Sequence, residues 1–312
     1  MKMDCLTLGE PLICFDSDDL PLDATGTVRS YAVGAESNVA IGLARLGWDV
    51  AYVGRVGADS AGRVIARTLR GEGVDVSALR TVPDLVTGLL LKEGDGPGRV
   101  TVTYHRAGSA GSTLAPEDLP ADLTGLRRLH VTGITLVLGE TARAATIEAM
   151  RRARAAGARV SLDANFRRKL ADDAALAGAF AEAAPLADEV FLGRGEAALC
   201  AGSESDDAIE HFARSLPGTT VLKGARGGAT AFVSGARHEH PAEPVAVVDP
   251  VGSGDAFVVG WLHALLGGGT VEDALATGAR VAARVISRRG DYQGLPYPED
   301  LARTDGLAAV SR

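Results

Sequence analysis

The stretch Asp249-Pro-Val-Gly-Ser-Gly-Asp-Ala-Phe257 joins a glycine-rich turn to two carboxylates. A strand-like apolar pattern, Val245–Val248, comes before it, and a helix-like apolar pattern, Phe257–Leu266, follows it. We therefore expect the turn to leave the carboxyl end of a strand and to open into the amino end of a helix. The first amides of a helix have no acceptor within the helix, so the amides of residues 252–255 are expected to bind an anion.

Asp255 is the candidate general base of this turn. A carboxylate placed there can take a proton from a hydroxyl group that attacks a bound phosphate. Gly252, Ser253 and Gly254 would form the anion hole, because glycine allows unusual φ values and close approach to a phosphate. A bare Gly-x-Gly-Asp is weak evidence in a chain with 39 glycines, and an Asp that only caps a helix fits it too. The strand–turn–helix context favours the catalytic interpretation.

Outward from this turn, strand-like and helix-like patterns alternate along the chain. Strands are expected at residues 4–9, 50–53, 129–132, 159–162, 189–192 and 220–222, and helices at 36–46, 58–70, 141–156, 171–183, 206–216, 254–266 and 271–287. Such alternation is typical of an α/β fold in which helices cover both faces of a mostly parallel sheet. We expect one domain that spans residues 1–312.

Two segments, at about 15–33 and 87–106, break this alternation. Each has the pattern of short strands joined by turns, with no helix between them. They are expected to pair into a small antiparallel sheet beside the main one, as a lid that covers a substrate and excludes water. The alternative is a pair of surface hairpins without a function. The free edges of a lid sheet also favour a homo-oligomer that forms through the lid.

Charge and composition exclude several classes of protein. The formal net charge is −8 and the pI is about 5.3, whereas nucleic-acid binders usually carry a basic excess. The 3 cysteines are widely spaced, which argues against a disulfide framework or a zinc site and for the reducing cytoplasm. No apolar run reaches the roughly 18 residues of a membrane span. Asp4, Glu10 and Pro11 indicate that the first apolar segment is a core strand and not a signal peptide.

A second informative segment, Gly34–Gly47, places small residues before a helical pattern and Asn38 in its first turn. Asn38 could simply cap this helix. The alternative is that the Gly34 backbone and the Asn38 amide bind hydroxyl groups of a substrate. Asparagine occurs only twice in the chain, as Asn38 and Asn165, and both lie in candidate motifs, which favours the second interpretation.

On these two segments the chain resembles the ribokinase-like (PfkB-type) carbohydrate kinases. Gly34–Gly47 is similar to the amino-terminal signature of that family and Asp249–Phe257 to its carboxyl-terminal signature, and the resemblance extends from Leu8 to Asp291. It implies a three-layer α/β/α sandwich with a small β-sheet lid. It also implies that ATP binds across the carboxyl ends of the strands and that Asp255 activates a sugar hydroxyl.

The resemblance further implies a set of nucleotide and metal contacts. Mg²⁺ would bridge the phosphates, with Glu196 reaching it through water, and K⁺ would bind near Asp249. The nucleotide contacts would come from Asn165, Lys223, Gly228 and Gly254. The chain departs from the family pattern at Val33, where a glycine is usual, at Ser253, where alanine is usual, and at Gly193, where asparagine is usual.

Within the family, Ser161-Leu-Asp-Ala-Asn-Phe-Arg167 and Arg106-Ala-Gly-Ser-Ala110 resemble the 2-keto-3-deoxygluconate kinases. This resemblance implies that a sugar acid is phosphorylated on its 6-hydroxyl. Its contacts would be Gly34, Asn38, Tyr104, Arg106, Arg167 and Asp291. Tyr104 and Arg106 stand at i and i+2 of a strand and so face one side, and the planar fork of arginine suits a carboxylate. Fructokinases carry similar segments, so a neutral ketohexose stays open as the substrate.

Two other functions compete with that of a kinase. A dinucleotide-dependent oxidoreductase needs Gly-x-Gly-x-x-Gly directly after its first strand, and Gly9-Glu-Pro-Leu12 stands there instead. A noncatalytic sugar sensor on a kinase fold stays open because the chain departs from the family pattern at Gly193 and at Ala225, although Asp255 is retained.

Overall fold

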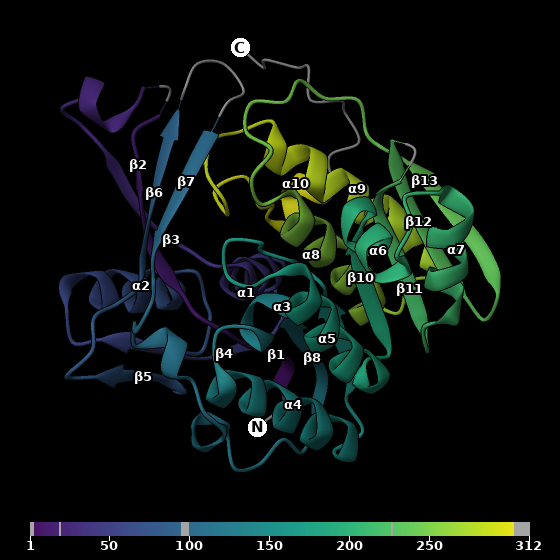
Figure 1. The fold of residues 1–312 in the computed structure, drawn as a ribbon, viewed down its shortest axis with the longest axis horizontal. Helices are drawn as coiled ribbons and strands as arrows, with labels where there is room; N and C mark the ends of the chain where they lie inside the picture. The colour runs from purple at the N-terminus through teal and green to yellow at the C-terminus, as the bar shows by residue number, and fades with distance from the viewer. Residues whose placement is uncertain (1–2, 19, 95–99, 226, 303–312) are drawn as a thin grey trace.

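The computed structural model describes residues 3–18, 20–94, 100–225 and 227–302. Its centre is a nine-stranded sheet (Figure 1). The strand order is β13 (Ala236–Pro241), β12 (Gly228–Val233), β11 (Thr219–Ala225), β10 (Glu189–Gly193), β9 (Arg159–Asp163), β8 (Leu126–Thr132), β1 (Met3–Leu8), β4 (Val50–Gly57) and β5 (Leu79–Val82). The strands from β11 to β5 run parallel, and β12 and β13 add an antiparallel hairpin at one edge.

Helices cover both faces of this sheet, as the alternating pattern predicts. One face packs against α1 (Ala35–Arg45), α2 (Ser60–Gly71), α8 (Ser253–Leu266) and α9 (Val271–Ile286). The other face packs against α4 (Glu140–Ala155), α5 (Asp173–Ala183), α6 (Arg194–Ala201) and α7 (Asp206–Ser215). Two short helices are α3 (Gly133–Leu136) and α10 (Pro298–Ala302). None of the helices in the described part of the chain has the length and hydropathy to cross a bilayer.

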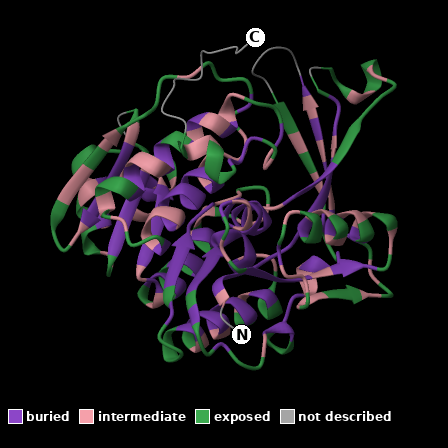
Figure 2. Ribbon diagram, turned by 180° about the vertical axis from the view of Figure 1, so that it is seen from behind, coloured by how far each residue is buried: buried purple, intermediate pink, exposed green. Residues whose placement is uncertain are grey.

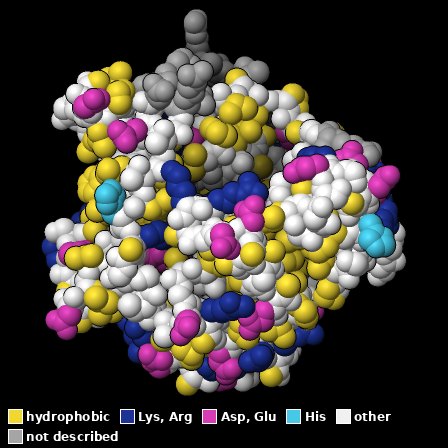
Figure 3. All heavy atoms as spheres, in the orientation of Figure 1, with side chains coloured by type: hydrophobic (Ala, Val, Ile, Leu, Met, Phe, Trp, Pro, Cys, Tyr) yellow, Lys and Arg dark blue, Asp and Glu magenta, His cyan; other side chains and the backbone are white. Residues whose placement is uncertain are grey.

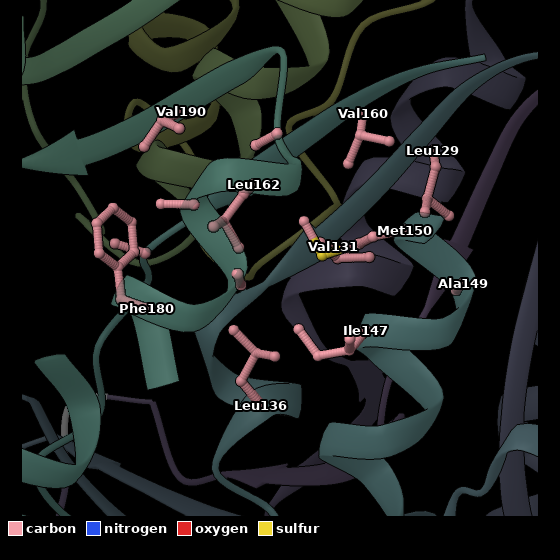
Figure 4. Close-up of a cluster of buried hydrophobic side chains, with 14 of the residues drawn as sticks. Leu129, Val131, Leu136, Ile147, Ala149, Met150, Val160, Leu162, Phe180 and Val190 are labelled. Atoms are coloured by element: carbon pink, nitrogen blue, oxygen red, sulfur yellow. The ribbon is translucent and has the colours of Figure 1, made fainter. Parts of the chain in front are cut away.

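The side-chain alternation of the strands divides the core into two layers. Val190 and Leu192 of β10 face the layer with α4–α7, whereas Phe191 between them faces the layer with α1, α2, α8 and α9. Successive side chains of a strand point to opposite faces, so an apolar run supplies both layers at once. The close-up shows side chains of β8 and β9 meeting Ile147 and Met150 of α4 (Figure 4). The fold class predicted from the sequence is confirmed.

A second, four-stranded sheet projects from the side of the body (Figure 1). We call it the lid sheet, and its strand order is β3 (Arg29–Val33), β2 (Leu12–Asp16), β6 (Leu89–Gly94) and β7 (Val100–His105). β2 and β6 pair in parallel, and the outer pairs are antiparallel. The lid sheet carries its own small apolar cluster, and much of its outer part is exposed (Figure 2). Because β2 begins at Leu12, the first lid segment starts slightly before the expected position at about residue 15.

One expected strand is wrong. Val245–Val248 forms no strand, and the side chains of Val247 and Val248 are 61% and 47% exposed. The segment is held by the end of α9, since the amides of Val248 and Asp249 both donate to the Ile286 carbonyl, at 2.8 and 3.1 Å. The run of valines therefore fitted a strand in pattern only, because no neighbouring strand pairs with it. The sequence interpretation also missed the strands β5, β12 and β13 and the helices α3, α6 and α10.

The close packing of α8 on α9 gives a test of this core. A Cβ on Gly260 would lie 2.5 Å from the Thr277 carbonyl oxygen and 2.7 Å from the Gly278 Cα, and both of these are backbone atoms that cannot swing away. Gly260→Ala is therefore expected to lower the free energy of unfolding by about 1–3 kcal/mol, seen as a lower urea midpoint.

Gly178→Ala is the matched control, since nothing lies within 4 Å of its added Cβ on α5. The higher helix propensity of alanine should raise the free energy of unfolding by up to about 1 kcal/mol. A Gly260→Ala protein that unfolds at the wild-type midpoint would contradict the packing described here.

Candidate active site

The candidate residues come from the carboxyl edge of the parallel strands. Asp163 ends β9, Gly193 ends β10, and Lys223 lies near the end of β11. Glu10 follows β1 in the same way. Because parallel strands all end at one edge, this topology gathers polar groups from distant parts of the chain, and such edges are where open α/β sheets bind ligands.

Asp255 lies in the first turn of α8, only 8% exposed, and two asparagine amides hold its carboxylate. Asn38 Nδ2 donates to Oδ2 at 2.9 Å, and Asn165 Nδ2 donates to Oδ1 at 3.2 Å. Asn38 does not cap α1, whose N-cap residue is Gly34. Asn165 has a φ of 41°, a left-handed conformation that asparagine tolerates better than most residues. Both asparagines of the chain therefore fix one carboxylate, which keeps lone pairs free to accept a proton.

Burial changes the acidity of two carboxyl groups here. Burial raises the pKa of Asp255 above its ordinary value and the charge of Asp163 adds to this, while the Asn38 hydrogen bond and the charge of Arg167 act against it. Burial also raises the pKa of Asp291 to about 7, against the attraction of the Lys92 ammonium. A raised pKa brings a carboxylate closer to the strength that suits a general base near neutral pH.

The turn before α8 is built around Gly252, which has a φ of 78°. A Cβ there would lie 2.7 Å from the Asp291 carbonyl oxygen, so both conformation and space require glycine. Ala256 donates to the Gly252 carbonyl at 2.9 Å, the first hydrogen bond within the helix. The amides of Ser253 to Asp255 thus have no acceptor in α8 and stand at its positive end, where an anion is stabilised.

Tyr104 lies in β7 of the lid sheet, and this strand ends at His105, one residue before Arg106, which was expected in it. The guanidinium carbon of Arg106 lies 5.4 Å from the centre of the Tyr104 ring. Arg106 is 7% exposed, and its Nε donates to Glu10 Oε2 at 2.7 Å. Nη2 of Arg106 also pairs with Glu10, and Ser109 Oγ donates to the other carboxylate oxygen. The charge of Arg106 is therefore balanced within the protein, while Nη1 keeps further donors.

Arg167 differs from Arg106 in having no carboxylate partner. Its hydrogen bond is a 3.3 Å contact from Nη1 to the Phe166 carbonyl, and across the described residues no acidic side chain lies within ion-pair distance of it. The next residue, Arg168, is paired with Asp173 at 2.7 Å. Arg167 is half-buried and lines the cavity that also contains Asp255. A guanidinium that forms no ion pair with the described residues is suited in that position to binding an anion.

Lys223 and Gly228 lie on the hairpin expected to contact a nucleotide. Lys223 Nζ donates to Asp163 Oδ2 and would lie 3.1 Å from a Cβ on Gly254, so the ammonium stands beside the turn before α8. A Cβ on Gly228 would lie 2.2 Å from the His240 carbonyl oxygen. The pairing of β12 with β13 therefore already requires glycine at residue 228.

Glu196 is the residue expected to reach Mg²⁺ through water. Its carboxylate accepts the amides of Gly193, at 2.6 Å, and Phe166, at 2.7 Å. Burial raises its pKa, and the charge of Asp163 adds to this. Asp163 Oδ1 is buried without a hydrogen-bond partner, so the carboxylates of Glu196 and Asp163 together can accept further hydrogen bonds. In residues 3–302, apart from positions 19, 95–99 and 226, no group of three His, Cys, Asp or Glu side chains forms a metal site.

Asp249, the residue expected near K⁺, already has a cation. Its carboxylate forms a buried ion pair with the ammonium of Lys92, which comes from β6 of the lid sheet. The amide of Val251 donates to Oδ1 at 3.1 Å, and the amide of Gly290 donates to Oδ2 at 3.3 Å. Both oxygens of Asp249 are thus occupied by donors from the protein.

The expected substrate residues line one cavity of about 90 Å³ between the lid sheet and the body. Its lining includes Gly34, Asn38, Tyr104, Arg106, Arg167, Gly252, Asp255 and Asp291. A second cavity of about 450 Å³ shares Val102, Tyr104 and Arg167 with the first, so the two adjoin. The space-filling view shows Lys and Arg side chains around a hollow beside the lid sheet (Figure 3).

The sequence interpretation missed Glu10 and Lys92. Lys92 lies two residues after Leu90 and on the same buried face of β6. A charged residue at a position where the alternating pattern predicts a buried side chain is a signal that can be read from the sequence. Glu10 lies two residues after the apolar strand β1, at the strand end where α/β sheets often place catalytic and binding residues.

The sequence as a whole is similar to two curated sugar kinases. The chain is 36% identical to a 2-dehydro-3-deoxygluconokinase of Bacillus subtilis strain 168, over 97% of this chain and 95% of that protein. It is 35% identical to a fructokinase of Klebsiella pneumoniae, over 92% and 95%.

Among solved structures, a double mutant of a Vibrio cholerae O395 fructokinase, with fructose, ADP and potassium ion bound, superposes with a TM-score of 0.84 at 26% identity, over 96% of this chain and 98% of that one. Residues 5–298 match the pfkB family of carbohydrate kinases as a whole. The chain belongs to the pfkB family of carbohydrate kinases and is a sugar kinase.

Proposed function

We propose that this kinase transfers the γ-phosphoryl group of ATP to the 6-hydroxyl of 2-keto-3-deoxygluconate, a compound also named 2-dehydro-3-deoxygluconate. The observation that carries the proposal is Arg167, a cation without a carboxylate partner among the described residues, in the cavity that contains Asp255. A sugar acid brings the carboxylate that this guanidinium lacks. The identity of 36% with a kinase of that name supports the choice.

The geometry of the site suits phosphoryl transfer to a hydroxyl. Asp255 accepts the proton of the hydroxyl as its oxygen bonds to the γ-phosphorus, and the bond from that phosphorus to the bridging oxygen of ADP breaks. The amides of residues 253–255 hold the negative charge of the transferring group. The Lys223 ammonium stands beside them, placed to contact the phosphates. Asn38 and Asn165 keep the base pointed at the hydroxyl.

Mg²⁺ fits this site as an ion held mainly by the nucleotide. Mg²⁺ usually keeps several waters and binds one or two carboxylates together with phosphates. Glu196 and Asp163 have the unused acceptor capacity to receive such waters. When bound, the ion would neutralise charge on the phosphates. K⁺ at the Asp249 carboxylate does not fit, because the Lys92 ammonium already neutralises the charge of this carboxylate and stands at its Oδ2.

Fructose is the second candidate, and one observation favours it. Glu10 already neutralises Arg106, so only one of the two expected carboxylate contacts carries a free charge. A neutral ketohexose needs only hydrogen-bond donors and acceptors and no charged partner. Asn38, Asp291 and Nη1 of Arg106 can supply these hydrogen bonds. The fructokinase relative at 35% identity supports this alternative.

We also propose that two copies of the chain associate through the exposed edges of the lid sheet, which are β3 and β7. A mass in solution equal to one chain would contradict this association.

We further propose that the chain works in the cytoplasm. All three cysteines are free, in keeping with a reducing compartment.

The first test is ADP release with Mg-ATP and a panel of 2-keto-3-deoxygluconate, gluconate, fructose and ribose. The keto-deoxy acid is expected to give the highest kcat/KM. Asp255→Asn is expected to lower kcat by about 10²–10⁴-fold, because the general base is lost. Fructose with the highest kcat/KM would favour the second candidate, and binding without turnover of any sugar would favour a sensor.

The second test asks whether Arg167 binds the substrate carboxylate. Arg167→Gln is expected to raise KM for the sugar acid by roughly 10- to 100-fold, the usual cost of a lost hydrogen bond to a charged group, and to affect KM for fructose much less. Steady-state kinetics with both substrates measure the ratio of the two KM values.

Arg168→Gln is the matched control, because it removes the same charge from a side chain that is paired with Asp173. The ratio of KM values should then stay at the wild-type value. If Arg167→Gln raises both KM values by the same factor, Arg167 does not discriminate a carboxylate.

A further inference from the structure

The lysine on the inner face of the lid sheet has a role that phosphoryl transfer, as described above, does not use. Lys92 lies in β6 in phase with the buried Leu90, and its side chain is only 5% exposed. A lysine is almost never so fully buried unless its charge is paired. Its stem lies within the lid sheet, so its ammonium reaches out of the lid toward the body.

The partner of this ammonium is the carboxylate at the base of the anion-binding turn. Lys92 Nζ donates to Asp249 Oδ2 across a separation of 157 residues. Asp16 Oδ2 lies 3.8 Å from the same nitrogen and accepts the Tyr31 hydroxyl at 2.7 Å. The attraction of Asp249 and Asp291 more than offsets burial and raises the pKa of Lys92, so the group is a cation at all ordinary pH values.

Asp249 also connects this cation to the turn that binds the anion. One of its oxygens accepts the amide of Val251, directly before Gly252, and the other accepts the amide of Gly290, directly before Asp291. The position of the carboxylate therefore sets the position of two segments of the active site. A buried carboxylate needs a nearby cation to keep its charge, because an unpaired charge in this setting is very costly.

We propose that Lys92 is a positioning residue whose ammonium takes the place of a monovalent metal cation at Asp249, so that catalysis by this chain needs no added K⁺. Ammonium and K⁺ carry the same charge and are of similar size, so either can neutralise the carboxylate. The tethered ammonium has the advantage that it is always present and that it joins the lid sheet to the turn. This inference rests on the proposed phosphoryl transfer.

The test compares kcat in KCl, NH₄Cl and choline chloride at equal ionic strength, with Mg-ATP and the best sugar of the panel. Wild-type kcat is expected to agree within about twofold in all three salts, since the cation is built in. The kcat of Lys92→Met is expected to fall by at least about tenfold in choline chloride, because the buried charge of Asp249 is left unpaired. KCl or NH₄Cl should restore this kcat.

Two further variants locate the effect. Lys169→Met removes a lysine that contacts the lid through the Val102 carbonyl and forms no ion pair with a described carboxylate, and it should acquire no dependence on K⁺. Adding Asp249→Asn to Lys92→Met removes the charge that needs a cation, and the dependence on K⁺ should disappear. A Lys92→Met protein that is slowed equally in every salt, or a wild-type protein that K⁺ activates, would overturn the inference.

Thermal unfolding provides a readout that does not depend on the substrate. KCl should raise the Tm of Lys92→Met relative to choline chloride and leave the Tm of the wild type unchanged. If no sugar is turned over in any salt, the proposed function fails while this comparison still decides the role of Lys92. If KCl changes the Tm of both proteins equally, Lys92 does not take the place of a monovalent cation.

Discussion

The site depends on the hydrogen bonds that two asparagines donate to the buried carboxylate of Asp255. The donors, Asn38 and Asn165, lie 217 and 90 residues from Asp255 along the chain. These bonds form only when the start of α1, the end of β9 and the start of α8 meet at one place. The parallel sheet brings them there, because its strands end at a common edge and its helices begin near that edge. The fold thereby holds the Asp255 carboxylate in one orientation, beside the backbone amides of residues 253–255 that have no acceptor in α8.

Two of the buried ion pairs near this carboxylate connect the lid region to the body. Lys92 of the lid sheet pairs with Asp249, and Arg106, which directly follows the last lid strand, pairs with Glu10. A buried pair contributes little net stability, but removing one partner is costly, so such pairs fix geometry more than they stabilise the fold. Arg167 is unpaired among the described residues. In our proposal the substrate supplies its missing partner.

Some features of the sequence predicted the fold well, and others gave no sufficient signal. Alternation of apolar strands and helices predicted the layers, because a run such as Val190–Leu192 supplies both faces of a sheet. Val245–Val248 is also an apolar run and forms no strand, since pairing depends on neighbours that a local pattern does not contain. The rarity of asparagine pointed to Asn38 and Asn165, but not to Asp255 as their shared acceptor. The pair of Lys92 with Asp249 was likewise hidden, because a separation of 157 residues leaves no local signal for a partner.

The most direct test of the account is the pH dependence of kcat/KM, which reports the free enzyme. Burial raises the pKa of Asp255 above its ordinary value of 3.8, so activity should fall as the pH is lowered through a limb that lies above 3.8. Burial also raises the pKa of Asp291, to about 7, so this carboxyl group is a second source of such a limb, and Asp291→Asn is measured beside the wild type. The account predicts that the limb persists in Asp291→Asn and moves, if at all, to lower pH, because a neighbouring carboxylate is gone. A limb that vanishes in Asp291→Asn would contradict the assignment of Asp255 as the base.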